Sequence, residues 1–351
     1  MSLMEVETGP VDLLGLASSA FHHPIRLQSP VKVAGRELFP TEVFDTYWKF
    51  AATRQKVYER RIAGLPGPWT DDSIISEHRF TNCFRASDRV SQFLINNVIY
   101  EGAQDPEEVV FRILLFKFFN KISTWELLQS ELGAPTREKF SIVEYDRVLS
   151  AAMSAGKKIY SAAYVVPPPK MGEVRKHKNH LRLLERMLDD SISDRLQDCA
   201  EMQDAFGVLR SYPAMGNFLA YQFLIDINYS EVLDFDEMDF VVPGPGARDG
   251  LRKCFGDRSR GIEAEIIRYM CDSQDEHFAR LGLEFRGLQG ARSLQLVDCQ
   301  NLFCEVDKYA RVAHPDIEGY SGRSRIKQKF VAARAPLNPV FPRKWMLDER
   351  T

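Results

Sequence analysis

The chain is organised around Val241–Phe255, VVPGPGARDGLRKCF. Two valines lead into Pro-Gly-Pro-Gly, and a segment with apolar residues at helical spacing follows. Gly244 and Gly246 have no Cβ atom, so they can adopt positive φ and bring backbone N–H groups close to a ligand. A helix beginning after Gly246 would offer its free N–H groups and its dipole to an anion. The pattern predicts a hairpin between two short helices that binds a DNA phosphate, although an ordinary turn explains the same residues.

A second segment, Leu294–Arg311 (LQLVDCQNLFCEVDKYAR), predicts a helix that opens on Val297-Asp298. At a helix N-terminus the Asp298 carboxylate would accept hydrogen bonds from backbone N–H groups. A purely structural role as a helix cap is enough to explain an Asp at this position. An apolar-Pro-Gly-x-Gly hairpin followed by a Val-Asp helix resembles the helix-hairpin-helix DNA glycosylases, in which this Asp is catalytic. The pairing requires an insertion around residues 257–293.

Composition is that of a globular protein large enough for two lobes. The 351 residues are 44% hydrophobic and 27% charged, with a net charge of −3. Any DNA contact must therefore use a local basic face. The six cysteines are scattered without metal-binding spacing, and we expect reduced thiols and no metal site. We see neither a signal peptide nor a run long enough to span a membrane, so we expect a cytoplasmic protein with no membrane partner.

Helical periodicity recurs along the chain, and no segment alternates strictly between apolar and polar residues. We therefore predict an all-α fold, with residues 1–40 as an extended or partly ordered arm. The predicted helices are Thr41–Ala63, a pair within Pro106–Leu132, Tyr145–Tyr164, one or two within Leu181–Leu209, and one after Gly216.

The segment His78–Tyr100 carries many polar side chains within an apolar frame. It is either a solvated helix face or a pocket that reads a base. The amide side chains favour the pocket, because amides suit base edges better than a helix surface. With aromatic and amide residues elsewhere, the candidate base pocket comprises Trp48, Asn82, Arg85, Asp88, Gln92, Asn120, Tyr221 and Gln222.

The most basic stretch is Lys170–Arg186, which is either a solvated helix start or a contact to DNA phosphates. His177 and His180 are too isolated to indicate a metal site. The candidate DNA-contacting residues are Gly244, Gly246, Arg248, Lys253, Lys176 and Lys178.

Six blocks, in order, carry a more specific resemblance: YWKFAATRQ, RFTNCFRASDRVSQFLINNVIY, FRILLFKFFNKISTWELL, GNFLAYQFLIDINYS, VVPGPGARDGLRKCF and LVDCQNLFCEVDKYAR. Over residues 41–330 the chain resembles the α-glutamyl/putrescinyl thymine pyrophosphorylase family, which includes an antiphage DNA glycosylase. The resemblance implies a helix-hairpin-helix glycosylase-like fold, with two helical lobes and a cleft between them. Residues 41–105 and 297–351 would form a terminal lobe, and 106–296 a central lobe carrying the hairpin 241–255, with Asp298 at the seam.

The function that the resemblance implies is a monofunctional DNA glycosylase. It would flip out and excise a glucosylated or hypermodified pyrimidine from phage DNA as antiviral defence, leaving an abasic site, with Asp298 as the catalytic carboxylate. Arg248 stands where bifunctional relatives carry their Schiff-base lysine, and arginine is a poor nucleophile. We expect a monomer that binds double-stranded DNA with modified bases. We expect no cofactor other than a monovalent cation that the hairpin could hold.

Two other functions remain open. One is a pyrophosphorylase or transferase acting on a phosphorylated 5-hydroxymethylpyrimidine in DNA, which would need a phosphate cradle and usually Mg²⁺. The chain has no GxxxxGK[ST] loop, and the spacing of Glu305 and Asp307 puts them on different helix faces. The other is a non-catalytic DNA-binding module.

Overall fold

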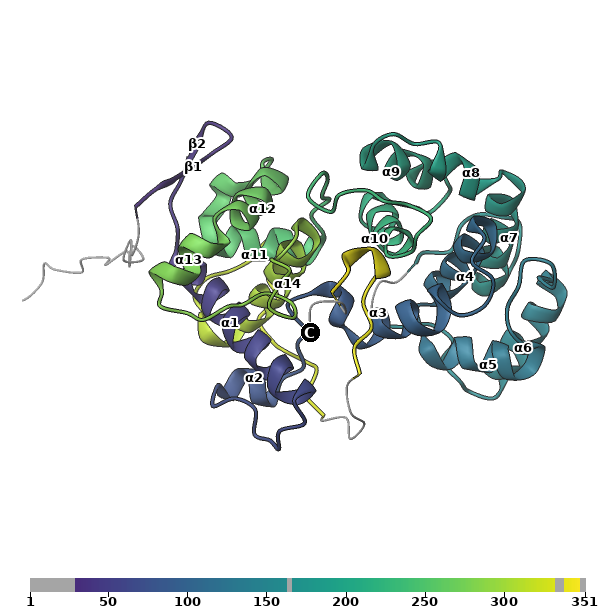
Figure 1. Ribbon diagram of the computed structural model, residues 1–351, viewed down its shortest axis with the longest axis horizontal. Coiled ribbons are helices and arrows are strands. Elements are labelled where there is room, and N and C mark those ends of the chain that lie inside the picture. The colour runs from purple at the N-terminus through teal and green to yellow at the C-terminus, as the bar shows by residue number, and fades with distance from the viewer. Residues whose placement is uncertain (1–28, 163–165, 332–337, 348–351) are drawn as a thin grey trace, which may run out of the picture.

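The computed structural model describes residues 29–162, 166–331 and 338–347, and its helices form two lobes side by side (Figure 1). The prediction of an all-α fold is confirmed for this part of the chain. Its sheet is a small antiparallel hairpin, β1 (Val31–Val33) with β2 (Arg36–Leu38). These short strands lie in the predicted arm, residues 1–28 of which are outside the described residues.

The first lobe is built around α14 (Leu296–Ala313), which packs on α1 (Glu42–Ile62), α11 (Pro245–Phe255) and α12 (Glu263–Asp272). Shorter elements complete it: α2 (Ser73–Glu77), the 3₁₀ turn η3 (Gly256–Ser259) and α13 (Gln274–Arg280). Thr41 caps α1 by accepting a hydrogen bond from the backbone N–H of Val43.

The second lobe surrounds α4 (Pro106–Phe119), a helix buried nearly all round, as its apolar sequence predicts. Asn120 ends α4 in the left-handed conformation, with φ of 47°. The other helices of this lobe are α5 (Ile122–Leu132), α6 (Ile142–Ser154), α7 (Lys176–Asp189), α8 (Ile192–Gln197), α9 (Met202–Arg210) and α10 (Asn217–Asn228).

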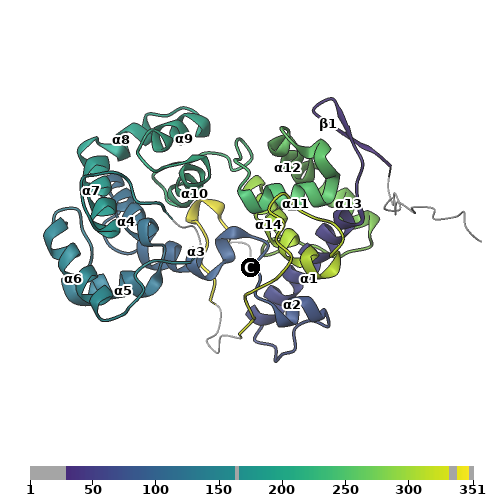
Figure 2. The ribbon, with the colours of Figure 1, turned by 180° about the vertical axis from the view of Figure 1, so that it is seen from behind.

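Besides residues 229–244, which run from α10 to α11, two segments connect the lobes. The first runs through the turn η1 (Arg85–Ser87), α3 (Arg89–Leu94) and the π-helical turn η2 (Ile95–Ile99). The second is the C-terminal segment. Its Lys329 forms a β-bridge with His78 of the first lobe, and further along it contains η4 (Arg343–Trp345). Trp345 packs edge-on against Tyr229 of the second lobe, with ring centroids 5.6 Å apart, and this segment is seen beside α10 in Figure 2.

Several boundaries differ from those expected. Helices α11 to α13 pack on α1 and α14, so the hairpin segment lies in the lobe formed by the chain ends and not in the central one. The insertion 257–293 supplies α12 and α13, while Leu181–Leu209 holds three helices. Helix α6 ends well before Tyr164, because Gly156 adopts a φ of 77° that stops it.

The predicted tight hairpin between two short helices is wrong. Helix α10 ends at Asn228, and residues 229–244 form turns and irregular chain before α11 begins. Gly244 is the N-cap of α11, with φ of −77°, and Gly246 is also absent from the residues with positive φ. Both glycines are needed for close packing instead: a Cβ would stand 2.6 Å from the Phe218 ring at Gly244 and 2.7 Å from Cys304 Sγ at Gly246.

Candidate functional site

Five polar residues from both lobes meet where the lobes join, and we call them the seam cluster: Arg85, Lys117, Gln222, Asp226 and Asp298. They come from η1, α4, α10 and α14, and each is at most 4% exposed. The seam is therefore filled by side chains at this point, and the expected cleft is not seen here.

Arg85 is the centre of the seam cluster. Its guanidinium donates from Nε to Gln222 Oε1 (3.0 Å) and from Nη1 to Asp226 Oδ1 (2.7 Å), both on α10. Its backbone N–H donates to Asp298 Oδ1 (2.7 Å) on α14. One residue thus ties the helix that carries Asp298 to the second lobe.

Asp226 lies between two cations, because Lys117 Nζ stands 2.6 Å from its second carboxylate oxygen. Burial alone would raise the pKa of Asp226, but Arg85 and Lys117 outweigh it and hold the pKa below its usual value. The carboxylate therefore stays ionised. Moving η1 or α4 away from α10 would leave the Asp226 charge buried and uncompensated, which is strongly destabilising.

Asp298 is in the third position of α14 and forms a capping box with Gln295. Its Oδ2 accepts from the Gln295 N–H (3.0 Å), so both carboxylate oxygens already have backbone donors. Burial raises the pKa of Asp298 to about 7, against the lowering effect of these hydrogen bonds. Asp298 thus lies at the start of a helix and at the seam, as predicted. Its hydrogen bond to the Gln295 N–H shows the capping role that the sequence left open.

Three residues of the candidate base pocket instead hold the η1 turn together. Asn82 accepts from Arg54 and donates to the Ser87 carbonyl (2.7 Å), while its N–H donates to Asp88 Oδ1 (2.8 Å). Burial raises the pKa of Asp88 to about 7. Gln92 uses both ends of its amide on backbone: Nε2 donates to the Ala86 carbonyl (2.7 Å), and Oε1 accepts from the Val340 N–H (2.8 Å). Gln92 therefore fastens the C-terminal segment.

Three further residues of that prediction are dispersed. Trp48 lies in the core of the first lobe, stacked on the His277 ring at 5.1 Å, because α1 turns its apolar face inward. Tyr221 is fully buried on α10, next to Gln222 of the seam cluster. Asn120 accepts from Lys117 Nζ (3.2 Å) and so borders the cluster. The base pocket predicted from sequence is thus only partly brought together, around Arg85 and Gln222.

Some candidate DNA-contacting residues are exposed, and others already form contacts within the protein. Arg248 is exposed in the first turn of α11, beside Gly246. Lys253 is 1% exposed, with Nζ 3.2 Å from Asp307 Oδ1, so it cannot reach a phosphate, and that prediction is wrong.

The basic stretch is largely neutralised within its own lobe. Lys178 stands 3.0 Å from Glu173, whose carboxylate also pairs with Arg182. Lys176 lies over the Tyr160 ring, with Nζ 4.3 Å from the ring centre. These contacts favour the solvated-face interpretation over phosphate binding.

Sequence reasoning missed Lys117 and Arg54, both buried cations on helices whose periodicity indicates core. No group of three or more His, Cys, Asp and Glu side chains within residues 29–162, 166–331 and 338–347 is arranged to hold a metal ion. All six cysteines are free thiols. Of the helices described, none is both long and apolar enough to cross a membrane.

Comparison with known proteins identifies the lineage. Residues 41–319 match the family described as 5-hmdU DNA kinase, helical domain. A protein of Bacillus phage SP10 named 5-hmdU DNA kinase is 26% identical over 291 residues, which is 76% of this chain and 45% of the phage protein. The chain thus spans less than half the length of this curated relative. No solved structure matches.

These matches correct the glycosylase prediction. The relative is named for a kinase, which transfers a phosphoryl group, and not for a hydrolase that breaks the glycosidic bond. The glycosylase function is therefore wrong, and the role of Asp298 as its catalytic carboxylate falls with it. The expectation of a protein related to modified pyrimidines in DNA is supported at that coarser level. The chain belongs to the 5-hmdU DNA kinase family, which it matches through the helical domain.

Proposed function

We propose that this chain recognises 5-hydroxymethyldeoxyuridine in DNA and presents its hydroxymethyl group for phosphoryl transfer. The observation that carries the proposal is the match of residues 41–319 to the helical domain of a kinase acting on that base. The matched range includes both lobes and every residue of the seam cluster. The two-lobed arrangement held by Arg85 therefore lies within the matched range.

Phosphorylating a base demands access and positioning. The hydroxymethyl oxygen attacks the terminal phosphorus of a donor nucleotide, loses its proton and displaces the nucleoside diphosphate. Such transfer depends chiefly on alignment of the two reactants and on charge stabilisation. Enzymes that act on a base generally take it out of the stack, at a cost of a few kcal/mol. A recognition domain supplies this step by binding the duplex and holding the extruded base.

The first turn of α11 supports a role in binding DNA. Pro245, the first residue of α11, has no N–H, but the N–H groups of Gly246 and Ala247 precede the first intrahelical hydrogen bond, and Arg248 is exposed in the same turn. A helix N-terminus beside an arginine attracts a phosphate without reading sequence. This surface would position the duplex independently of base modification.

We assign recognition, and not nucleotide binding, to this chain, because the matched domain is the helical one of a longer kinase. The assignment is tested by equilibrium binding to otherwise identical duplexes that carry either hydroxymethyldeoxyuridine or thymidine at one position. We expect about tenfold tighter binding to the modified duplex, the value of about one net hydrogen bond to the added hydroxyl.

Arg248→Ala serves as the matched variant in that assay. It should weaken binding to both duplexes equally, since a phosphate contact carries no sequence information. Equal affinity of the wild-type chain for the two duplexes would overturn the proposed function. Incubation with terminally labelled ATP and Mg²⁺ then asks whether the chain also transfers phosphate by itself.

A further inference from the structure

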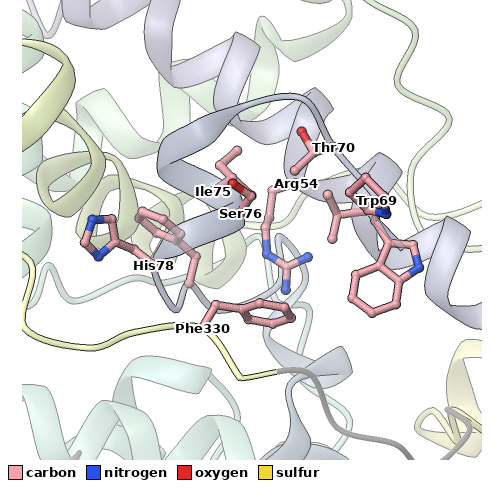
Figure 3. A pocket seen from close by; sticks show the side chains of 10 residues that line it. Arg54, Trp69, Thr70, Ile75, Ser76, His78 and Phe330 are labelled. Carbon is pink, nitrogen blue, oxygen red and sulfur yellow. The ribbon is translucent and has the colours of Figure 1, made fainter. Parts of the chain in front are cut away.

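A cavity of about 140 Å³ lies in the first lobe, outside the seam cluster (Figure 3). Its walls come from α1, from the segment through α2 and from the C-terminal segment. The lining side chains are Arg54, Val57, Pro68, Trp69, Thr70, Ile75, Ser76, His78, Phe80 and Phe330. None of the functions assigned above uses this cavity.

Arg54 is the charged group of the cavity and is only 6% exposed. Its Nη2 donates to Asn82 Oδ1, while the buried Nη1 has no hydrogen-bond partner among the residues that the structure describes. In the same residues, no carboxylate forms an ion pair with this guanidinium, and burial lowers its pKa. A buried donor left unpaired costs about 1–3 kcal/mol, so the site is suited to a ligand that brings an acceptor.

The walls around Arg54 are aromatic. Figure 3 shows its guanidinium pointing toward the space between Trp69 and Phe330. The Trp69 and Phe330 rings are nearly perpendicular, with centroids 6.3 Å apart. His78 Nδ1 is a second buried atom without a hydrogen-bond partner in the described part of the chain. Flat apolar surfaces with one or two polar atoms suit a planar ring that carries carbonyl groups.

The size of the cavity restricts the ring. An apolar cavity of about 150 Å³ accommodates benzene, so about 140 Å³ fits one six-membered ring and not a purine. Inorganic phosphate would pair with the guanidinium but gain nothing from aromatic walls, and it would lose its hydration. A pyrimidine uses both features, because its faces contact the aromatic rings and a carbonyl oxygen accepts from Arg54.

We propose that the Arg54 cavity is a pyrimidine-binding site, in which a carbonyl oxygen of the ring accepts a hydrogen bond from Arg54 Nη1. The inference rests on the proposed function, since the ring would be the 5-hydroxymethyluracil extruded from DNA. Ser76 lines the cavity and is itself exposed, so the cavity has a solvent-facing side there.

The test uses the full chain and two serines of α2. Ser76→Phe places a ring in the cavity, whereas Ser73→Phe adds the same side chain at an exposed position that does not line it. Both variants replace exposed residues, so folding should be retained. We expect Ser76→Phe to lose the preference for the hydroxymethyldeoxyuridine duplex over the thymidine duplex, about tenfold in the wild type. Its affinity for the thymidine duplex and the behaviour of Ser73→Phe should not change.

Trp69 fluorescence measures binding in the cavity independently of DNA. Because the chain has four tryptophans, comparison with Trp69→Phe gives the part of the emission that comes from Trp69. The probes are free 5-hydroxymethyl-2′-deoxyuridine and inorganic phosphate. We expect the nucleoside, and not phosphate, to change the emission, and Arg54→Met to abolish the change. A response to phosphate alone would overturn the pyrimidine assignment.

The outcomes separate this inference from the proposed function. If Ser76→Phe keeps the full preference for the modified duplex, the cavity is not the base site, although the proposed function stands. If the wild type shows no preference between duplexes, the proposed function fails. The cavity is then judged by the nucleoside alone: a Trp69 response supports a pyrimidine site, and its absence overturns it.

Discussion

Gly250 of α11 packs directly against the backbone of α14, and replacing it with alanine tests that packing. Gly250 lies inside α11, and a Cβ atom there would stand 2.8 Å from the carbonyl carbon of Phe303 and closer still to its oxygen. Both atoms belong to the backbone of α14, so they cannot rotate away. The two helices would have to separate, and α14 carries Asp298 and its bond to Arg85.

The change in the free energy of unfolding caused by Gly250→Ala is the sum of two opposing effects. Alanine favours a helix over glycine by about 1 kcal/mol, which would stabilise the variant. Overpacking costs about 1–3 kcal/mol and occasionally more, and a clash with backbone belongs at the upper end. We therefore expect Gly250→Ala to lower the free energy of unfolding by about 2 kcal/mol or more.

Urea unfolding followed by circular dichroism measures this change, and Gly207→Ala is the matched control. Gly207 is also helical, in α9, but is exposed, and a Cβ there meets nothing within 4 Å. The control should gain up to about 1 kcal/mol from helix propensity. If Gly250→Ala were as stable as Gly207→Ala, the close approach of α11 to α14 at this position would be refuted.

Other substitutions test separate features of the molecule. Lys253→Met should lower the free energy of unfolding by about 3 kcal/mol, because it leaves Asp307 buried without one of its cations, and thermal or urea unfolding measures the loss. Because the pKa of Asp298 is raised to about 7, the folded state binds a proton that the unfolded state releases above about pH 4. Its contribution to stability is therefore present at low pH and lost as the pH rises to 7, and Asp298→Asn should flatten this part of the stability–pH curve. Gln92→Ala should loosen the C-terminal segment, seen as faster amide hydrogen exchange at Val340. Arg248→Ala should reduce the salt dependence of DNA binding by about one phosphate contact, and an unchanged slope would remove Arg248 from the DNA surface.

Local signals in the sequence were enough to predict many helices. The cap Thr41, the continuous apolar surface of α4 and Gly216 before α10 each act within one turn of chain. Asp298 was predicted at a helix start for the same reason. These features depend on neighbours in sequence, which periodicity reports directly.

Long-range packing could not be predicted in this way. Gly244 and Gly246 were expected to serve a turn, but their partners Phe218 and Cys304 are distant in the chain and require close contact, not positive φ. The amide of Gln92 is occupied by Val340, which lies 248 residues away.

Chemistry was harder still to predict than packing. A Val-Asp helix start and a Pro-Gly-x-Gly segment are local features of the chain, and they do not distinguish a hydrolase from a member of the 5-hmdU DNA kinase family. The charge of Lys253 suggests a DNA contact, but the side chain is buried against Asp307. The Arg54 cavity had no signal in the sequence, because its walls come from three separate segments.

The proposed function requires the chain to hold a hydroxymethylated pyrimidine out of the duplex. It is tested most directly by a duplex with 2-aminopurine next to the hydroxymethyldeoxyuridine, since emission of 2-aminopurine rises when its neighbour unstacks. We predict a rise on adding the protein that is several-fold larger than with thymidine at the same position. Equal emission from the two duplexes, at protein concentrations that saturate both, would contradict it.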